Sequence, residues 1–543
     1  MRTHPTPISL RSIVLTAGLA ACSASVLALV ACSTGNSWGS SGTPRGFVLD
    51  GDTREWRGGI TTAADAETVS FRFSPGEEAT LQANDETTRL LFDLDNDPAT
   101  GEPLVGPPDV GTLGVDLEIL MSPLLTDLPP GSAASIRNRR LERGQPASPF
   151  ATGITIIRNN PDGTVTRLKH ADIGFMASPT YASDFFEARI DRTADALEGS
   201  GIDSAGGAKA IVLMTGTAGE VVRYSEPIEF VLPDAADEKI LTKKGIPQQM
   251  PGTIRVLSMN VLRGKPQTEP APFARLIAAI EPDVILFQEA DDFDEPALEA
   301  WLSGFVGPLP GKHEWASGIQ GLSGNLAGGV GVWDAVAMPD LGVAIATPHV
   351  ITHGYDEPVE IEDPRTGRRR TVRAVTALVS TPAGNLLATS THLKCCGSAG
   401  SEEDTLRYAE AGAINAAFSA AESDVRGNLG RDIDAKIIGG DMNLVGTRGP
   451  LDVLREGLGA GGRDLQPAMT GVIGETALYT WRDDRGYFSP GRLDWFLTGN
   501  ASVAQAFAVD TRLMDPDRLA TWGLYPDDSA VSDHLPVVVD LMP

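Results

Sequence analysis

Cysteine is almost absent from this chain of 543 residues, which contains only four. Two lie near the N-terminus, and the other two, Cys395 and Cys396, are adjacent. This excludes a conventional disulfide framework and a zinc site built from cysteines. Positive charge is also scarce, because 44 Lys and Arg face 72 Asp and Glu, for a net charge of −28. That balance argues against binding a polyanion through bulk charge. It does not exclude hydrolysis of a phosphate ester, since a bound metal supplies local positive charge.

One long apolar run stands out, and it lies near the start of the chain. Arg2 and Arg11 precede the run, which ends in "LVAC" at Cys32 and is followed by polar residues. The pattern resembles a bacterial lipoprotein signal peptide over residues 1–32, with Cys32 as the lipidated residue. A second match ends at Cys22, but more apolar sequence follows it. A transmembrane anchor is the alternative interpretation, because the run is long enough to span a bilayer.

The rest of the chain divides by composition into two domains. Residues 33–45 are rich in Ser and Gly and are expected to form a flexible tether. Short apolar strands separated by turn residues then predict an all-β sandwich over 46–233. A charged, Pro- and Gly-bearing linker is expected at 234–252, and strands alternate with helical patterns from 253 to 543. That alternation predicts a layered α/β domain, with strands at 253–261, 283–290 and 435–443 and helices at 271–282 and 402–423.

Polar residues follow many of the apolar strands of the second domain. Strand ends are where rigid scaffolds present catalytic groups, so we expect one constellation at one edge of the sheets. Its members are Asn260, Glu289, His392, Asp441, Asn443, Asp494, Asp533 and His534. Oxygen-rich groups suit a hard cation such as Mg²⁺, with Mn²⁺ as an alternative, and the imidazoles suit proton transfer. The alternative is that these residues have only structural roles. Asn260 would then cap a turn, Glu289 would be a solvated loop acid, and His392 would be a structural histidine with its hydrogen bonds satisfied. Asp494 would form a surface ion pair with Arg492.

These strand ends resemble motifs of the endonuclease/exonuclease/phosphatase family, which includes secreted DNases, abasic-site endonucleases, bacterial sphingomyelinases and inositol polyphosphate phosphatases. The matching stretches, in the family's order, are "LSMNV", "PDVILFQE", "THL", "GGDMN", "RLDWFL" and "SDHLPV". The resemblance covers residues 253–541. It implies an α/β four-layer sandwich (DNase I-like) as C-terminal domain, behind the N-terminal all-β sandwich domain.

The resemblance also implies roles for individual residues. Glu289 would be the principal metal ligand, with Asn260 and Asp533 completing or supporting the site. Asp441, held with Asn443, would orient and deprotonate the attacking water. His534 would contact the phosphoryl oxygens with Asp494 fixing its orientation, and His392 would stabilise or protonate the leaving oxygen.

Three stretches depart from the family pattern or remain ambiguous. Residues 328–340 carry Asp334 and no Arg where the family often has "G-x-A-I-x-S-R", so substrate contacts from this stretch are in doubt. Cys395 and Cys396 follow His392 closely, and they form either a pair with no role or a vicinal disulfide. The basic stretch 365–373 is either a solvated hairpin tip or a contact for phosphate at the rim of the site.

The first domain resembles family 9-type carbohydrate-binding modules and related sandwiches over residues 46–233. The matching stretches are "FVLDGDTREW", "LFDLDNDPATGEP" and "GVDLEI". Asp93, Asp95 and Asp97 alternate as oxygen ligands of Ca²⁺ do, although the loop is no EF-hand because Leu104 occupies the twelfth position. A plain acidic turn is the alternative. Trp56 and Phe92 are the nearest aromatic candidates for stacking on a sugar.

The sequence therefore predicts an exported, lipid-anchored, Mg²⁺-dependent phosphodiesterase, with nucleic acid as the preferred substrate. A phospholipid or sphingolipid head group, or an inositol phosphate, is the second choice. A catalytically silent binding protein on the same fold is the alternative from another class. No protein partner is inferred.

Overall fold

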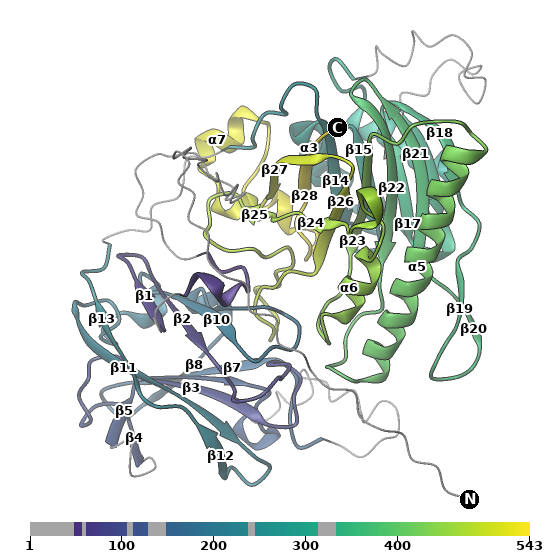
Figure 1. Ribbon diagram of the computed structural model, residues 1–543. Coiled ribbons are helices and arrows are strands. Elements are labelled where there is room, and N and C mark those ends of the chain that lie inside the picture. Colours follow the sequence, from purple (N-terminus) through teal and green to yellow (C-terminus); the bar gives the residue numbers. More distant parts are fainter. Residues whose placement is uncertain (1–47, 57–60, 106–111, 129–147, 237–244, 313–332) are drawn as a thin grey trace, which may run out of the picture. The chain divides into compact units, whose positions relative to one another are not determined.

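A computed structural model describes residues 48–56, 61–105, 112–128, 148–236, 245–312 and 333–543 of the chain (Figure 1). The predicted signal peptide, Cys22, Cys32 and the tether lie outside the described residues, as do residues 237–244 of the predicted linker. No helix among the described residues is both long and apolar enough to cross a membrane. Residues from Gly46 to Pro543 form a single unit by their contacts, so the predicted domain boundaries stay predictions.

The N-terminal region is built from antiparallel strands. One sheet has the order β1-β2-β10-β9, a second has the order β12-β11-β3-β6-β7-β8 with β13 also paired to β11, and β4 pairs with β5. The strands are β1 (Thr62–Ala64), β2 (Thr68–Phe73), β3 (Thr87–Asp93), β4 (Glu102–Val105), β5 (Thr112–Val115), β6 (Leu117–Met121), β7 (Ile154–Asn159), β8 (Val165–Leu168), β9 (Met176–Ser178), β10 (Phe186–Asp191), β11 (Gly206–Thr215), β12 (Val221–Tyr224) and β13 (Ile228–Leu232).

Alternating side chains build the core between these two sheets. Val69, Phe71 and Phe73 of β2 point into it, and Phe71 packs edge-on against Phe92 of β3. Successive side chains of a strand face opposite sides, so this period of two buries one face of the sheet. The predicted all-β region is therefore confirmed.

The C-terminal region contains two mixed sheets. Their orders are β16-β17-β15-β14-β28-β27-β25 and β18-β21-β22-β23-β26-β24, and β19 and β20 form a separate hairpin. The strands are β14 (Ile254–Asn260), β15 (Val284–Gln288), β16 (Asp334–Met338), β17 (Val343–Thr347), β18 (Val350–Tyr355), β19 (Glu360–Glu362), β20 (Arg369–Thr371), β21 (Ala374–Thr381), β22 (Gly384–His392), β23 (Ala435–Asp441), β24 (Gln466–Pro467), β25 (Gly471–Val472), β26 (Asp494–Gly499), β27 (Ser502–Ala508) and β28 (Val537–Met542).

Helices flank these sheets, and their burial patterns explain their positions. They are α2 (Lys265–Thr268), α3 (Pro270–Ile280), α4 (Glu295–Trp301), α5 (Glu402–Gly427), α6 (Gly449–Arg455) and α7 (Pro516–Thr521). In α3 the buried Phe273, Leu276, Ile277 and Ile280 recur at helical spacing and face the first sheet. The predicted start of α5 is confirmed, because the Ser401 side chain accepts a hydrogen bond from the Asp404 backbone N–H.

Four layers result from this packing. The core between the sheets contains Val256 and Ile437, the core beneath α3 contains Leu257, and the core beneath α5 contains Ile438. The central strands are thus buried on both faces, which explains their continuous apolar runs. Figure 1 shows α5 lying along the outer side of β21 and β22. The α/β four-layer sandwich predicted for this domain is confirmed.

Strand direction brings the polar strand ends together. β14 and β15 run parallel, as do β22 and β23, so each pair ends at the same edge of its sheet. Within the second sheet, Asp441 is in register with His392 on one side and with Asp494 on the other. β28 runs antiparallel to β14, so the residues that precede it return to the end of β14.

Gly440 allows two of these strands to approach closely. Its φ is +140°, and a Cβ at this position would lie 2.0 Å from the backbone oxygen of Thr391. Only glycine fits there without displacing β22. The residue before Asp441 is therefore fixed by the packing of the two strands that carry His392 and Asp441.

Candidate active site

Asp441 is the centre of the group of side chains at the strand ends. Its Oδ2 accepts hydrogen bonds from Nδ2 of Asn260 at 3.2 Å and from Nδ2 of Asn443 at 2.9 Å. The same oxygen lies 3.3 Å from Nε2 of His392 and 3.6 Å from Nε2 of His534. Burial raises the pKa of this carboxyl group to about 7, although the positive charge of His534 opposes the rise. A buried carboxylate surrounded by donors is well placed to hold a water or a proton at a defined point.

His534 is held as a cation by the carboxylate behind it. Its Nδ1 lies 2.8 Å from Oδ2 of Asp494, and both side chains are buried. Burial alone lowers the pKa of His534, but Asp494 and Asp441 overcome that effect and raise it to about 10. At neutral pH the ring is therefore an imidazolium, with Nε2–H facing Asp441.

His392, in contrast, is held as a neutral imidazole. The guanidinium of Arg373 donates a hydrogen bond to Nδ1 of His392 at 2.9 Å, so the proton of the neutral ring is on Nε2. Burial, together with the positive charge of Arg373, lowers the pKa of His392 well below its ordinary value. The site thus combines one charged and one neutral imidazole on either side of a single carboxylate.

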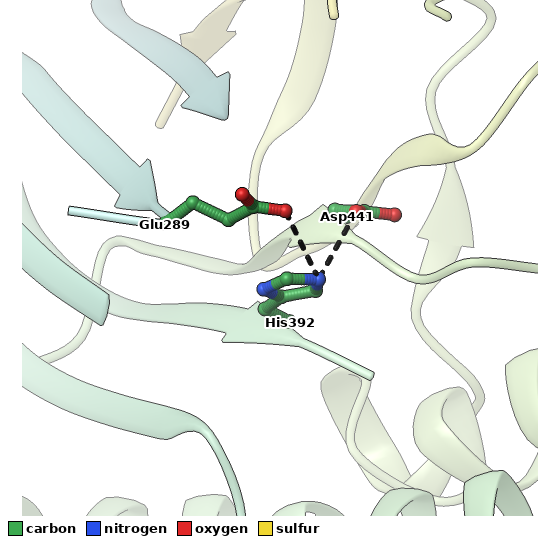
Figure 2. A group of neighbouring side chains, drawn as sticks. All are labelled: Glu289, His392 and Asp441. Atoms are coloured by element: carbon green, nitrogen blue, oxygen red, sulfur yellow. Dashed lines mark ion pairs between the residues drawn. The ribbon is translucent and has the colours of Figure 1, made fainter. Parts of the chain in front are cut away.

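Glu289 completes the group from the end of β15. Figure 2 shows Glu289, His392 and Asp441 converging, with Oε1 of Glu289 3.9 Å from Nε2 of His392. Nδ2 of Asn260 bridges the carboxylates of Glu289 and Asp441, while its Oδ1 accepts from the Leu262 N–H. Glu289 and Asn443 both have positive φ, at 53° and 47°. Such backbone conformations are unfavourable for glutamate and concentrate at functional sites.

The side chains present fit a hard divalent cation. Ligand atoms of Glu289, His392 and Asp441 lie within 4.8 Å of one another. Because one ring nitrogen of His392 carries the proton and the other accepts from Arg373, the two carboxylates are the groups that can bind an ion. Asp533 forms no ion pair with the described residues. Its Oδ2 accepts a hydrogen bond from Nε1 of Trp481, and its Oδ1 is buried without a hydrogen-bond partner. A buried, unsatisfied carboxylate oxygen is costly unless something binds it. Glu289 and Asp533 stay the predicted metal ligands, and Nδ2 of Asn260 donates hydrogen bonds to the carboxylates of Glu289 and Asp441.

The structure brings together all eight predicted site residues, although it leaves their roles as predictions. Glu289, His392, Asp441, Asn443, Asp533 and His534 also line one pocket. The surface-pair alternative for Asp494 is wrong: Arg492 stacks on Trp495 at 3.6 Å and donates to the Ala468 oxygen, while Asp494 is buried against His534.

Other predictions from the sequence have mixed outcomes. Oδ2 of Asp334 accepts from the Ile351 backbone N–H, so this side chain braces β18. Cys395 and Cys396 both line the pocket. The basic stretch does form a hairpin, in which Arg365 pairs with Asp363.

Sequence reasoning missed Arg373 and Trp481. Arg373 belongs to the basic stretch, but its side chain turns inward to His392, because the β21–β22 hairpin sets Arg373 beside that residue. The signal that could have found it is this hairpin register. Nothing in the local sequence marks Trp481, which lies far from Asp533 along the chain.

The fold and the site together define a class of protein. Four layers of helices and sheets, with Asn, Glu, Asp and His at the strand ends of both sheets, define a DNase I-like α/β sandwich. The family model described as "Endonuclease/Exonuclease/phosphatase family" matches residues 257–534. The chain therefore belongs to this family, and the family supports a hydrolase of phosphoesters.

Several solved structures are similar to about half of this chain. The human Nocturnin catalytic domain is 18% identical, covers 54% of this chain and 96% of its own, and has a TM-score of 0.32. Sphingomyelinase C from Streptomyces griseocarneus is 18% identical, with coverage of 53% and 99% and a TM-score of 0.30. A beta toxin from Staphylococcus aureus with bound magnesium ions is 18% identical, with coverage of 53% and 99% and a TM-score of 0.31. None of the curated proteins matches this chain.

Proposed function

We propose that the C-terminal domain is a Mg²⁺-dependent phosphodiesterase that hydrolyses nucleic acid. The observation that carries the proposal is the position of Asp441 between a charged and a neutral imidazole, at 3.6 Å and 3.3 Å. Hydrolysis of a phosphodiester needs a base for the attacking water and donors for the charge that develops on the phosphoryl and leaving oxygens. These three side chains supply both.

The residues divide the work as follows. Asp441, oriented by Asn443 and Asn260, accepts a proton from the attacking water. The imidazolium of His534, oriented by Asp494, donates a hydrogen bond to a phosphoryl oxygen. His392 donates a hydrogen bond from Nε2 to the leaving oxygen and stabilises its charge, and that oxygen takes up a proton from solvent as it departs; Arg373 keeps the ring neutral. Glu289 and Asp533 would hold Mg²⁺, which supplies positive charge to the phosphate when bound.

A substrate panel tests this function. The full chain is incubated with plasmid DNA, RNA, sphingomyelin, inositol phosphates and a chromogenic phosphodiester, each with Mg²⁺ and with EDTA. We expect cleavage of nucleic acid and of the chromogenic diester with Mg²⁺ and none with EDTA. Equal rates in EDTA would contradict the metal, and no turnover of any substrate would favour the catalytically silent binding protein.

A phospholipid or sphingolipid head group is the second candidate, and the charge of the chain favours it. A net charge of −28 repels a long polyanion but has less effect on a single head group. Release of phosphocholine from sphingomyelin, without cleavage of DNA or RNA, would decide for this candidate over the first.

We also propose that the protein is exported and anchored through a lipid on Cys32. The support is the motif "LVAC" after an apolar run. Cys32→Ser is expected to block acylation and move the protein out of the membrane fraction, as followed by metabolic labelling with palmitate and by fractionation. Cys22→Ser is the matched control and should stay in the membrane fraction. A Cys32→Ser protein that remains in the membrane fraction with an uncleaved N-terminus would show a transmembrane anchor instead.

A further inference from the structure

Three aspartates of the N-terminal sandwich meet outside the candidate active site. Asp93 ends β3, Asp95 follows it in the next loop, and Asp116 lies between β5 and β6. Their carboxylates each offer an oxygen, and these oxygens lie within 4.8 Å of one another. The pairing of β3 with β6 sets the arrangement, because the Asp116 N–H donates to the Phe92 oxygen and so fixes Asp116 beside Asp93.

Two of the three carboxylates are almost fully buried, and one has an oxygen with no partner. Asp93 is 2% exposed and Asp116 is 4% exposed. Oδ1 of Asp93 is buried and accepts no hydrogen bond. Within the part of the chain that the structure describes, none of the three makes an ion pair. Burying carboxylates together without a cation is unfavourable, because each loses its hydration and repels the others.

The remaining oxygens are held in place by the surrounding backbone. Oδ2 of Asp116 accepts from the Leu94 N–H at 2.7 Å, and Oδ1 of Asp95 accepts from the Asp97 N–H at 2.9 Å. The Thr100 hydroxyl also donates to Asp95. These bonds fix the direction of the carboxylates without neutralising them.

Asp97, which the sequence grouped with Asp93 and Asp95, does not join them. Its Oδ1 accepts from the Ala99 N–H at 3.0 Å and closes a turn of the loop. The alternation along the loop thus identifies only two of the three carboxylates. The third belongs to Asp116, in the connection between β5 and β6.

We propose that Asp93, Asp95 and Asp116 bind a Ca²⁺ ion. The group is made of oxygen ligands alone, with no histidine or cysteine, which favours a hard cation over zinc or copper. Irregular loops suit Ca²⁺, which takes six to eight oxygens in flexible geometry, better than Mg²⁺, which demands a near-octahedral arrangement. The site is independent of the proposed phosphodiesterase.

Calorimetric titration of the full chain with CaCl₂ tests the site. The titrations use the Glu289→Ala background, so that the candidate active site contributes little binding. We expect one Ca²⁺ site in the parent and a loss of affinity of at least about tenfold in Asp93→Asn and in Asp116→Asn, as for removal of groups that hold a metal. Asp97→Asn is the matched control and should bind like the parent.

Thermal unfolding gives a second readout. Ca²⁺ should raise the Tm of the parent and of Asp97→Asn, but not that of Asp116→Asn, because a ligand stabilises only the state that binds it. Asparagine at 116 can still accept the Leu94 N–H, so this variant should fold in EDTA, as shown by a cooperative transition. The proposal is overturned if the parent does not bind millimolar Ca²⁺, if Mg²⁺ binds there equally well, or if Asp97→Asn loses binding while Asp116→Asn keeps it.

Discussion

Glu289→Ala is expected to lower the rate of phosphodiester hydrolysis by about 10²–10⁴-fold at saturating Mg²⁺, because a bound metal contributes several kcal/mol of charge stabilisation. Thermal unfolding should change little. The Glu289 side chain is 22% exposed, and its hydrogen bond to Asn260 is 3.3 Å long. The rate is measured with the best substrate of the panel, and Mn²⁺ binding is followed separately by electron paramagnetic resonance.

Asp291→Ala is the control for this change, since it removes a neighbouring acid that lies outside the grouped ligand atoms. It should keep both the metal dependence and the rate. A Glu289→Ala protein with full rate at saturating Mg²⁺ and unchanged Mn²⁺ binding would show that Glu289 is not a metal ligand.

His534→Ala is expected to reduce the rate by about 10²–10⁴-fold, as for other positioned catalytic groups. Asp494→Asn should cost less, because the imidazole remains while its charge and orientation are less favoured. The 2.8 Å contact between Nδ1 of His534 and Oδ2 of Asp494 predicts that the two act as one unit. The double variant should therefore be little worse than His534→Ala alone.

Single-turnover rates of the four proteins complete this cycle, with circular dichroism to check that each is folded. Multiplicative losses in the double variant would show that Asp494 does not act through His534. In that case Asp494 would act directly on Asp441, with which it is paired in register.

The positions of the site residues could be predicted because they depend on strand direction. Asn260, Glu289, His392 and Asp441 each follow an apolar run, and parallel neighbours must end at the same edge. The same argument explains the fold class, since strands alternating with amphipathic helices form layers.

Contacts set by hairpin register and side-chain direction could not be predicted in this way. Arg373 lies in a basic stretch that reads as a solvated tip, yet it turns inward to His392. Asp116 was overlooked because spacing along one loop favoured Asp97, whereas the pairing of β3 with β6 places Asp116 next to Asp93. To predict the positions of Arg373 and Asp116, one must know which residues face each other on neighbouring strands. The apolar pattern of a single strand does not give this information.

The left-handed backbone at Glu289 has a consequence for how this protein trades stability against activity. Glycine would adopt a φ of 53° without steric cost, whereas glutamate at such a position costs roughly 1 kcal/mol or more. The layers of apolar strands around it must supply that free energy. Folding alone therefore does not explain why Glu289 stands at the end of β15, because its backbone conformation destabilises the fold. Selection for thermal stability alone would favour glycine at this position.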